Sequence, residues 1–361
     1  MPDNEWNGVS RRDFLKAAGA AGAVSLGAAA AIGGGLAQGR PARAAEPAGY
    51  GSGPGSAPPA AGTTAGKVDG ARAQELLARY PAPDADFYAR YLASFDTGKV
   101  TADLGGGRVR REYEVVAIDR NLEIAPGVVF PAWTFNGAVP GPTLRATEGD
   151  EMVVHFTNLG AKEHTIHFHG FHPGNMDGTF EVIRPGGTYE YRFTAEPFGL
   201  HLYHCHVMPL RMHIMRGLYG VMIIDPREPR PKAREMVMLM NGFDTDMDGE
   251  NEFYTVNGYA NYYTNERAIP VKVGELQRIY LVNVTEFDLV NSLHTHATFF
   301  HVYRTGTKLR PDDYTDTIML CQGERAILEF TYPFEGRFMF HAHQSEFAEL
   351  GWLGHFIARK G

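Results

Sequence analysis

The sequence has little cysteine and no basic runs, and both absences exclude classes of protein. Only two cysteines, Cys205 and Cys321, occur among the 361 residues, whereas a scaffold held by disulfides needs more cysteines at closer spacing. Asp and Glu outnumber Lys and Arg by 42 to 34, and no basic stripe interleaved with aromatic residues is present. We therefore expect no nucleic-acid partner.

Histidine is absent before residue 155, and all 15 histidines lie between His155 and His355. This uneven distribution of histidine separates an N-terminal leader from the region that is expected to contain the functional site. Residues 1–44 contain Arg11 and Arg12, followed by an uncharged Ala/Gly-rich stretch, which predicts a twin-arginine export signal. That stretch is nearly long enough to span a membrane but poor in Leu, Ile and Phe. An uncleaved anchor is the alternative, and we expect a periplasmic or otherwise extracytoplasmic protein without stable membrane insertion.

The leader is followed by two segments of different composition. Residues 45–70 are rich in Gly, Pro and Ala, which is typical of a disordered linker. Residues 71–104 have a helical spacing of apolar side chains that Pro81 and Pro83 interrupt, so we expect a short helical extension there.

The rest of the chain is built from short β-branched and aromatic runs separated by Gly, Pro and Asn, which indicate many short strands. Residues 133–158 are echoed by residues 253–283. Both passages run from an aromatic-Thr pair through Asn-Gly to an alternating strand that ends in Asn. We predict an all-β fold with two β-sandwich domains, residues 105–228 and 229–361.

Four histidine pairs share an i, i+2 spacing, two in each repeat. The pairs are His167 and His169, His204 and His206, His294 and His296, and His341 and His343. Side chains at i and i+2 of a strand point to the same face, so each pair presents two imidazoles to one side of a sheet. Eight neutral imidazoles suit several copper ions better than one zinc, which closes its structural sites at four ligands.

Cys205 lies between His204 and His206. A thiolate with two imidazoles and a weak axial position is the ligand set of a blue, type 1 copper. His164 precedes the first pair and His213 follows the cysteine on the same loop, so both imidazoles are available nearby.

The motifs FNGAVPGPTLRATEGD, HTIHFHG, HCHVMPLRMHIMRGLYG, HTH and FHAHQSE resemble those of multicopper oxidases, specifically small two-domain members with the blue site in the first domain. The resemblance covers residues 109–361. It implies Greek-key cupredoxin domains, a type 1 copper on His164, Cys205 and His213, and a trinuclear cluster on the eight paired histidines. About four coppers per chain, dioxygen as acceptor and a cyclic homotrimer with clusters between subunits are also implied.

The resemblance also predicts which residues lie near the metals. The axial position of the blue copper falls on Leu218, which cannot bind a metal, and Met215 or Met208 is the alternative. Met208, Met212 and Met215 either pack the loop or dock a reduced metal ion. Glu346 and Glu349 follow the last histidine pair, and we expect them to relay protons, orient ligands or form subunit salt bridges.

The remaining features are expected to be structural. Residues 244–255 begin like a calcium loop but end in Thr255 where a glutamate is required, and we interpret them as an acidic turn between the domains. Cys321 has no companion ligand and is expected to be a buried thiol. His155, His172, His201, His301 and His355 are interpreted as supporting residues.

Three functions remain open. The first is oxidation of a phenolic compound or of Cu(I), Fe(II) or Mn(II), coupled to reduction of O2 to water. The second is copper-dependent nitrite reduction, which needs a mononuclear type 2 copper and has no use for His206 or for both complete pairs of the second domain. The third is a copper-binding or electron-transfer protein without turnover.

Overall fold

The computed structural model describes residues 66–361, so the export signal and most of the predicted linker lie outside the described residues. Within this part of the chain, no helix has both the length and the apolar character needed to cross a membrane.

The first domain packs two sheets face to face. One has the order β1-β8-β6-β3-β2, with β4 also paired to β3, and the other has the order β5-β10-β9-β7. The strands are β1 Gly66–Lys67, β2 Lys99–Gly105, β3 Arg108–Ala125, β4 Val128–Phe135, β5 Leu144–Thr147, β6 Glu151–Asn158, β7 His167–Phe168, β8 Gly187–Thr194, β9 Gly199–His204 and β10 Tyr219–Asp225. Apolar side chains of both sheets, such as Val115, Tyr191, Tyr203 and Met222, form the core between them.

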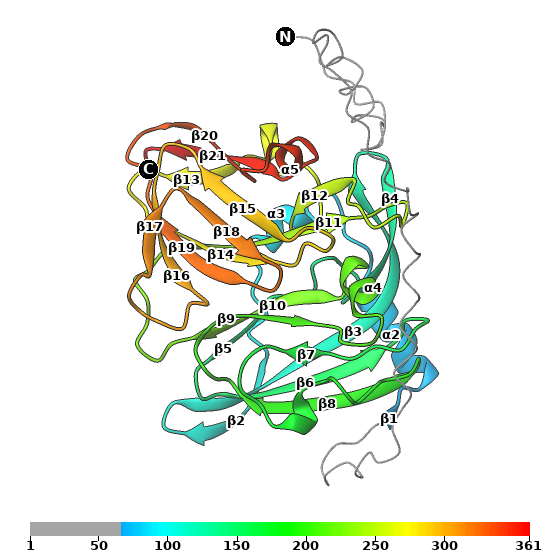
Figure 1. Ribbon diagram of the computed structural model, residues 1–361. Helices are drawn as coiled ribbons and strands as arrows, with labels where there is room; N and C mark the ends of the chain where they lie inside the picture. Colours follow the sequence, from blue (N-terminus) through cyan, green and yellow to red (C-terminus); the bar gives the residue numbers. More distant parts are fainter. Residues whose placement is uncertain (1–65) are drawn as a thin grey trace, which may run out of the picture. The chain divides into compact units, whose positions relative to one another are not determined.

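The second domain is built in the same way. Its sheets have the orders β12-β11-β14-β19-β16-β17 and β13-β21-β20-β15-β18. The strands are β11 Arg234–Phe243, β12 Phe253–Val256, β13 Ile269–Lys272, β14 Gln277–Asn283, β15 Val290–Thr295, β16 Phe300–Arg304, β17 Asp313–Thr315, β18 Thr317–Cys321, β19 Arg325–Phe330, β20 Gly336–His341 and β21 Leu353–Arg359. In Figure 1 the strands of the first domain are blue to green, and those of the second are yellow-green to red.

Strand pairing repeats between the domains. The parallel pair β3 and β6 corresponds to β11 and β14, and the parallel pair β5 and β10 corresponds to β13 and β21. The predicted all-β fold of two homologous sandwiches is confirmed, because alternating apolar residues in each repeat bury one face of each sheet.

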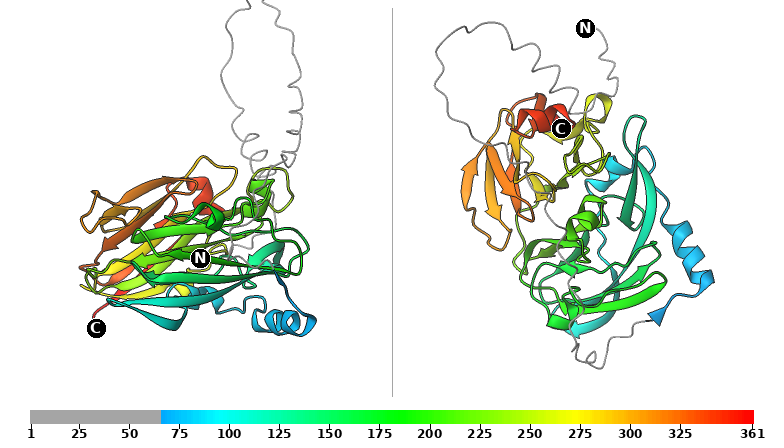
Figure 2. Two further views of the ribbon diagram at one scale, coloured as in Figure 1. Left: turned by 90° about the horizontal axis from the view of Figure 1, so that it is seen from below. Right: turned by 45° about the vertical axis from the view of Figure 1, so that its right-hand side comes forward.

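The helices are few and short: α2 Gly70–Arg79, α3 Phe87–Tyr91, α4 Leu210–Met215 and α5 Ser345–Glu349, with 3-10 turns at Gly174–Met176 and Asn265–Arg267. Asp69 caps α2 by accepting a bond from the Arg72 amide at 2.8 Å, and Leu76 packs against Val116 and Ile118 of β3. The right-hand view of Figure 2 shows this blue helix beside the cyan strands. The segment expected to be helical, residues 71–104, also contains β2, which pairs with β3.

The two domains share an apolar cluster and a partly buried ion network. Phe130, Leu200 and Val221 of the first domain pack with Val237 and Tyr280 of the second. Beside them, Arg145 binds both Asp225 and Glu235, and Arg278 binds both Glu235 and Glu329. These contacts fix the first domain against the second within the described residues.

Two predictions about the second domain were wrong. The acidic residues 244–252 join β11 to β12, which are neighbours in one sheet, so they form a hairpin loop within the domain and not a turn between domains. Cys321 is exposed, because side chains alternate between buried and exposed along the edge strand β18 and Cys321 lies on the exposed face.

Candidate metal centres

Three buried side chains of the first domain converge on one point. Cys205 directly follows β9, His213 lies in α4, and His164 is held by a two-way backbone bridge to Ile183. The Cys205 Sγ lies 3.2 Å from the His213 Nδ1 and 3.9 Å from the His164 Nδ1, and the two Nδ1 atoms are 3.3 Å apart. His164 and Cys205 are fully buried, and His213 is 4% exposed. The structure thus brings together the predicted thiolate site.

The electrostatics of this cluster suit a metal ion. Burial lowers the pKa of His164 to about 3, with the neighbouring His213 adding to the effect, and burial lowers the pKa of His213 to about 4. Both rings are therefore neutral at pH 7. Burial also raises the pKa of the Cys205 thiol. Two neutral imidazoles and one sulfur aimed at the same point form a soft donor set that fits copper.

Leu218 and Met215 lie close to this cluster in the chain. Leu218 is fully buried in the same apolar cluster as Cys205, and its carbonyl accepts the Cys205 amide at 2.9 Å. Met215 is 5% exposed at the end of α4, whereas Met208 is 68% exposed. Met208 therefore does not pack the loop as a core residue would.

The histidine pairs of the first domain meet where β7 pairs with β9. The register sets His167 opposite His204, and the Nε2 atoms of His169 and His204 face each other at 3.4 Å. The His206 ring lies 5.3 Å from the His167 ring between centroids. His167 and His204 each donate a proton from Nδ1 to a backbone carbonyl, of Asp177 at 2.8 Å and of Cys205 at 2.9 Å.

The second domain repeats this arrangement where β15 pairs with β20. The register sets His294 opposite His341, and the Nε2 atoms of His296 and His341 face each other at 3.1 Å. His294 donates from Nδ1 to the Asp316 carbonyl at 2.9 Å, and His341 donates to the Ala342 carbonyl at 2.6 Å. The His343 ring lies 5.4 Å from the His294 ring between centroids.

These hydrogen bonds decide which nitrogen can bind a metal. A ring that donates from Nδ1 carries its proton there, so its Nε2 keeps a free lone pair. Burial lowers the pKa of His169 to about 3 and that of His204 to about 4, and it also lowers the pKa of His296 and His341. The Nε2 atoms of His204 and His341 therefore present lone pairs toward His169 and His296, at 3.4 and 3.1 Å, and neutral imidazoles gathered in this way suit copper.

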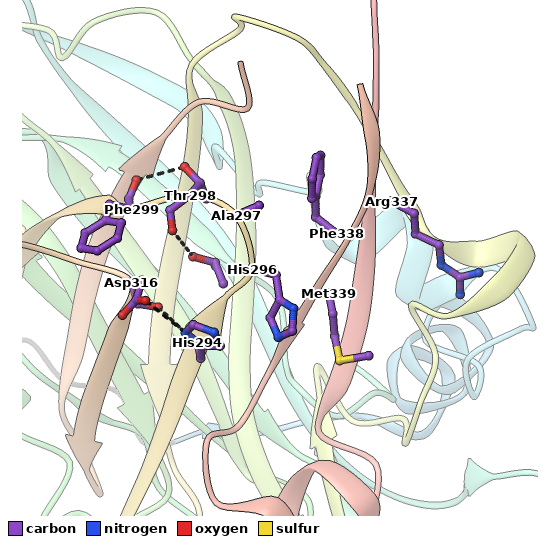
Figure 3. Close-up of a pocket in the computed structure, with 10 residues that line it drawn as sticks. His294, His296, Ala297, Thr298, Phe299, Asp316, Arg337, Phe338 and Met339 are labelled. Carbon is purple, nitrogen blue, oxygen red and sulfur yellow. Dashed lines mark hydrogen bonds and ion pairs between the residues drawn. The ribbon is translucent and has the colours of Figure 1, made fainter. Parts of the chain in front are cut away.

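Two of the paired histidines of the second domain, His294 and His296, line an open cavity of about 600 Å³. Figure 3 shows His294 and His296 on its wall, with Phe338 and Met339 across from them and Asp316 bonded to His294. Among the described residues, each set of three mutually close histidine ligand atoms comes from a single domain. One chain therefore presents two separate faces with four imidazoles each.

Four residues near these centres were not predicted from the sequence. The Asp177 carboxylate lies 3.3 Å from the His167 Nδ1, and the Asp316 carboxylate lies 3.9 Å from the His294 Nδ1. The Arg325 guanidinium lies 3.3 Å from the His169 Nδ1, and the Trp133 ring contacts both imidazoles of the thiolate site. The sequence offered one signal for two of them: each repeat has an aspartate, Asp177 or Asp316, after its first histidine pair.

The remaining candidates lie farther from the ligand atoms or in supporting positions. Glu346 and Glu349 belong to α5, directly after the last histidine pair, and their role stays a prediction. His172 and His201 bond to nearby backbone carbonyls, and His155 lies on the surface between Glu112 and Glu190.

Comparisons with known proteins agree with this geometry. Two family models, both described as multicopper oxidase, match residues 119–229 and 230–361. A solved structure described as a multicopper oxidase is 51% identical, covers 78% of this chain and 99% of its own, and superposes with a TM-score of 0.74. The copper nitrite reductase of Nitrosomonas europaea is 30% identical with a TM-score of 0.64, over 69% of this chain and 94% of its own.

A copper-containing nitrite reductase of Neisseria meningitidis is 32% identical over 258 residues, which span 65% of each chain. Residues 8–28 match the model of a twin-arginine signal sequence, which confirms the predicted export to the periplasm. The chain is thus an exported, copper-binding member of the multicopper oxidase family, with two domains of the cupredoxin fold.

Proposed function

We propose that this protein oxidises a donor one electron at a time at the thiolate site and reduces O2 to water at a three-copper cluster. The observation that supports this most is the pair of matching four-imidazole faces, each with the same strand register and the same Nδ1 bonds to backbone carbonyls. Copper bound at these residues would supply reversible one-electron steps between Cu(II) and Cu(I).

The chain's own residues hold and connect the two kinds of site. His204 and His206 flank Cys205, so the backbone offers a short covalent route from the thiolate to the imidazole face. The backbone carbonyls of Asp177 and Asp316 orient His167 and His294. The Asp177 carboxylate, 3.3 Å from the His167 ring, is placed to deliver protons that O2 reduction consumes, and Glu346 and Glu349 are further candidates for this relay.

Each cluster is proposed to form between two copies of the chain. Within one chain, the described residues give only half clusters, and the half in the second domain opens into the cavity of Figure 3. A cyclic homotrimer would pair the first-domain face of one subunit with the second-domain face of the next, and the ring would close without leaving a half cluster unpaired.

Nitrite reduction is the second candidate, since copper nitrite reductases are among the similar proteins. It needs only one copper besides the blue site. His206 and two complete pairs in the second domain would then have no role, although their rings lie as close together as those of the first domain. These extra imidazoles favour O2 as the acceptor.

The donor is proposed to be a phenolic compound or a reduced metal ion such as Cu(I), Fe(II) or Mn(II). The Met208 side chain is 68% exposed on the loop between Cys205 and His213, where its thioether is free to contact Cu(I). That exposure fits a metal-ion donor.

The test is copper content per chain, measured with the visible and paramagnetic resonance spectra of the copper-loaded protein. About four coppers per chain, with one blue, one type 2 and one coupled pair, are expected from eight cluster imidazoles and one thiolate site. The variant His296→Ala should keep the blue band, lose the coupled pair and stop consuming O2. His301→Ala, which changes an exposed histidine outside the pairs, is the matched control. Two coppers with nitrite turnover, or one blue copper without turnover, would contradict the proposal.

A further inference from the structure

The ligands of the thiolate site are almost completely shielded from solvent. His164 and Cys205 have no exposed surface, and His213 is 4% exposed. A donor at the surface therefore makes little direct contact with a ligand. Because electron tunnelling weakens steeply with distance, the residue that bridges this gap controls the rate of electron transfer from the donor.

Trp133 is the aromatic residue in that position. Its ring lies 4.9 Å from the His213 ring and 5.4 Å from the His164 ring between centroids, tilted by about 60° to each. The two imidazoles also contact each other. Among the described residues, no aromatic ring besides Trp133 contacts either of them. Trp133 is partly exposed, so one side chain connects the protein surface to both ligands.

The indole is held in place from two sides. Trp133 lies on β4, where Phe130 and Ala132 point into the core and Val129, Pro131 and Trp133 point the other way. Its amide donates to the Arg216 carbonyl at 2.9 Å. The Arg216 guanidinium lies 5.7 Å from the Trp133 ring centroid and donates to the Pro131 carbonyl at 2.6 Å. This cation is attracted to the indole face and opposes removal of an electron from it.

We propose that Trp133 conducts the donor's electron to the thiolate copper, an inference that rests on the proposed function. One electron leaves the donor, which departs oxidised by one electron, and Cu(II) held by His164, Cys205 and His213 would accept that electron and become Cu(I). The indole neither gains nor loses an electron overall, because the adjacent Arg216 makes an indole radical cation unfavourable. Trp133 thus provides the path for electron transfer from a donor at the surface to the buried ligands.

The test compares Trp133→Leu and Trp133→Phe with the parent protein, all loaded with copper. Bleaching of the blue band by 2,6-dimethoxyphenol is followed without oxygen in a stopped-flow instrument. Trp133→Leu should lower the bimolecular rate constant for bleaching about tenfold. Trp133→Phe, which keeps an aromatic ring, should give an intermediate rate constant. The control is Phe198→Leu, because Phe198 packs against the same core without a ring contact to either imidazole.

Three further measurements separate electron conduction from a structural role. The reduction potential, the resonance spectrum of the blue copper and the melting temperature of the copper-free protein should match the parent in all variants. An unchanged rate in Trp133→Leu, or a slower rate that a shifted potential explains, would overturn the inference. Oxygen is absent from the assay, so failure of O2 reduction alone would refute the proposed function and leave this inference standing. Absence of a blue band would overturn both.

Discussion

Glu235 joins the two domains through the partly buried ion network, and its replacement by glutamine should destabilise the protein strongly. Its carboxylate accepts four hydrogen bonds, two from Arg145 at 2.6 and 3.2 Å, one from Arg278 at 3.0 Å and one from the Tyr280 hydroxyl at 2.6 Å. Three of these reach Oε1 and one reaches Oε2. Glutamine has the same shape as glutamate, but it carries no charge. Its amide nitrogen, in the place of Oε2, would face the Arg145 guanidinium, which is also a donor.

The expected loss of stability follows from the contacts of Glu235. A hydrogen bond to a charged group contributes about 1.5–3 kcal/mol, and breaking a buried ion pair costs about 3–5 kcal/mol. The Glu235 side chain is 19% exposed, and Arg145 keeps Asp225 while Arg278 keeps Glu329. We therefore expect Glu235→Gln to lower the free energy of unfolding by about 3 kcal/mol.

Urea unfolding of both proteins measures this difference, with Glu75→Gln as the control. Glu75 also pairs with two arginines but is half exposed, so its replacement should change the unfolding midpoint little. The reasoning would be refuted if Glu235→Gln were as mild as the control. A change in the slope of the transition would show that the substitution alters the surface exposed on unfolding or the two-state character of the transition.

The pH dependence gives a second check on Glu235. Burial alone would raise its pKa, but hydrogen bonds from Arg145 and Tyr280 hold the pKa below the ordinary value of 4.5. A carboxylate with a depressed folded pKa contributes stability that is fully present above its unfolded pKa and is lost as pH falls through the folded pKa. The stability difference between the parent and Glu235→Gln should therefore shrink in acid and stay constant near neutral pH.

Two other substitutions test the site and its support. Asp177→Asn should keep the copper content, because the backbone carbonyl still orients His167, but should slow reoxidation by O2 about tenfold to a hundredfold; reoxidation at the parental rate would remove Asp177 from the proton relay. Gly137→Ala should lower the free energy of unfolding by at least about 2 kcal/mol, since φ is +79° and a Cβ would lie 2.5 Å from the Tyr80 carbonyl oxygen. Gly105→Ala, with φ of +77° and open space around it, shares the backbone strain without the clash, and equal losses in thermal melts would contradict the steric argument.

Short-range sequence patterns were enough to predict the fold class and much of the candidate copper sites. Strand periodicity is a short-range property, so the alternating runs gave the all-β class and the i, i+2 spacing put both imidazoles of each pair on one face. The repeat between residues 133–158 and 253–283 indicated two related domains, and the equivalent strand pairing bears this out. The placement of His164 and His213 around Cys205 could be predicted because few histidines lie close enough in the chain.

Contacts between distant strands could not be predicted in this way. Asp316 lies 22 residues after His294 in the sequence, and Trp133 lies 80 residues before His213. Their proximity depends on which strands pair and in which register. Cys321 was expected to be buried because thiols usually are, but its side chain points outward at the end of an edge strand, β18.

The sequence alone thus determined the fold class, the export signal and the residue types that can bind copper, since each follows from composition or from spacing along the chain. Tertiary structure decided the rest. The fold brings the Asp177 and Asp316 carbonyls to positions where they accept the Nδ1–H of His167 and His294, which leaves Nε2 of both rings free for a metal. Packing of β4 against α4 placed an indole over the buried thiolate site. Burial in this fold, which no local pattern encodes, keeps those imidazoles neutral.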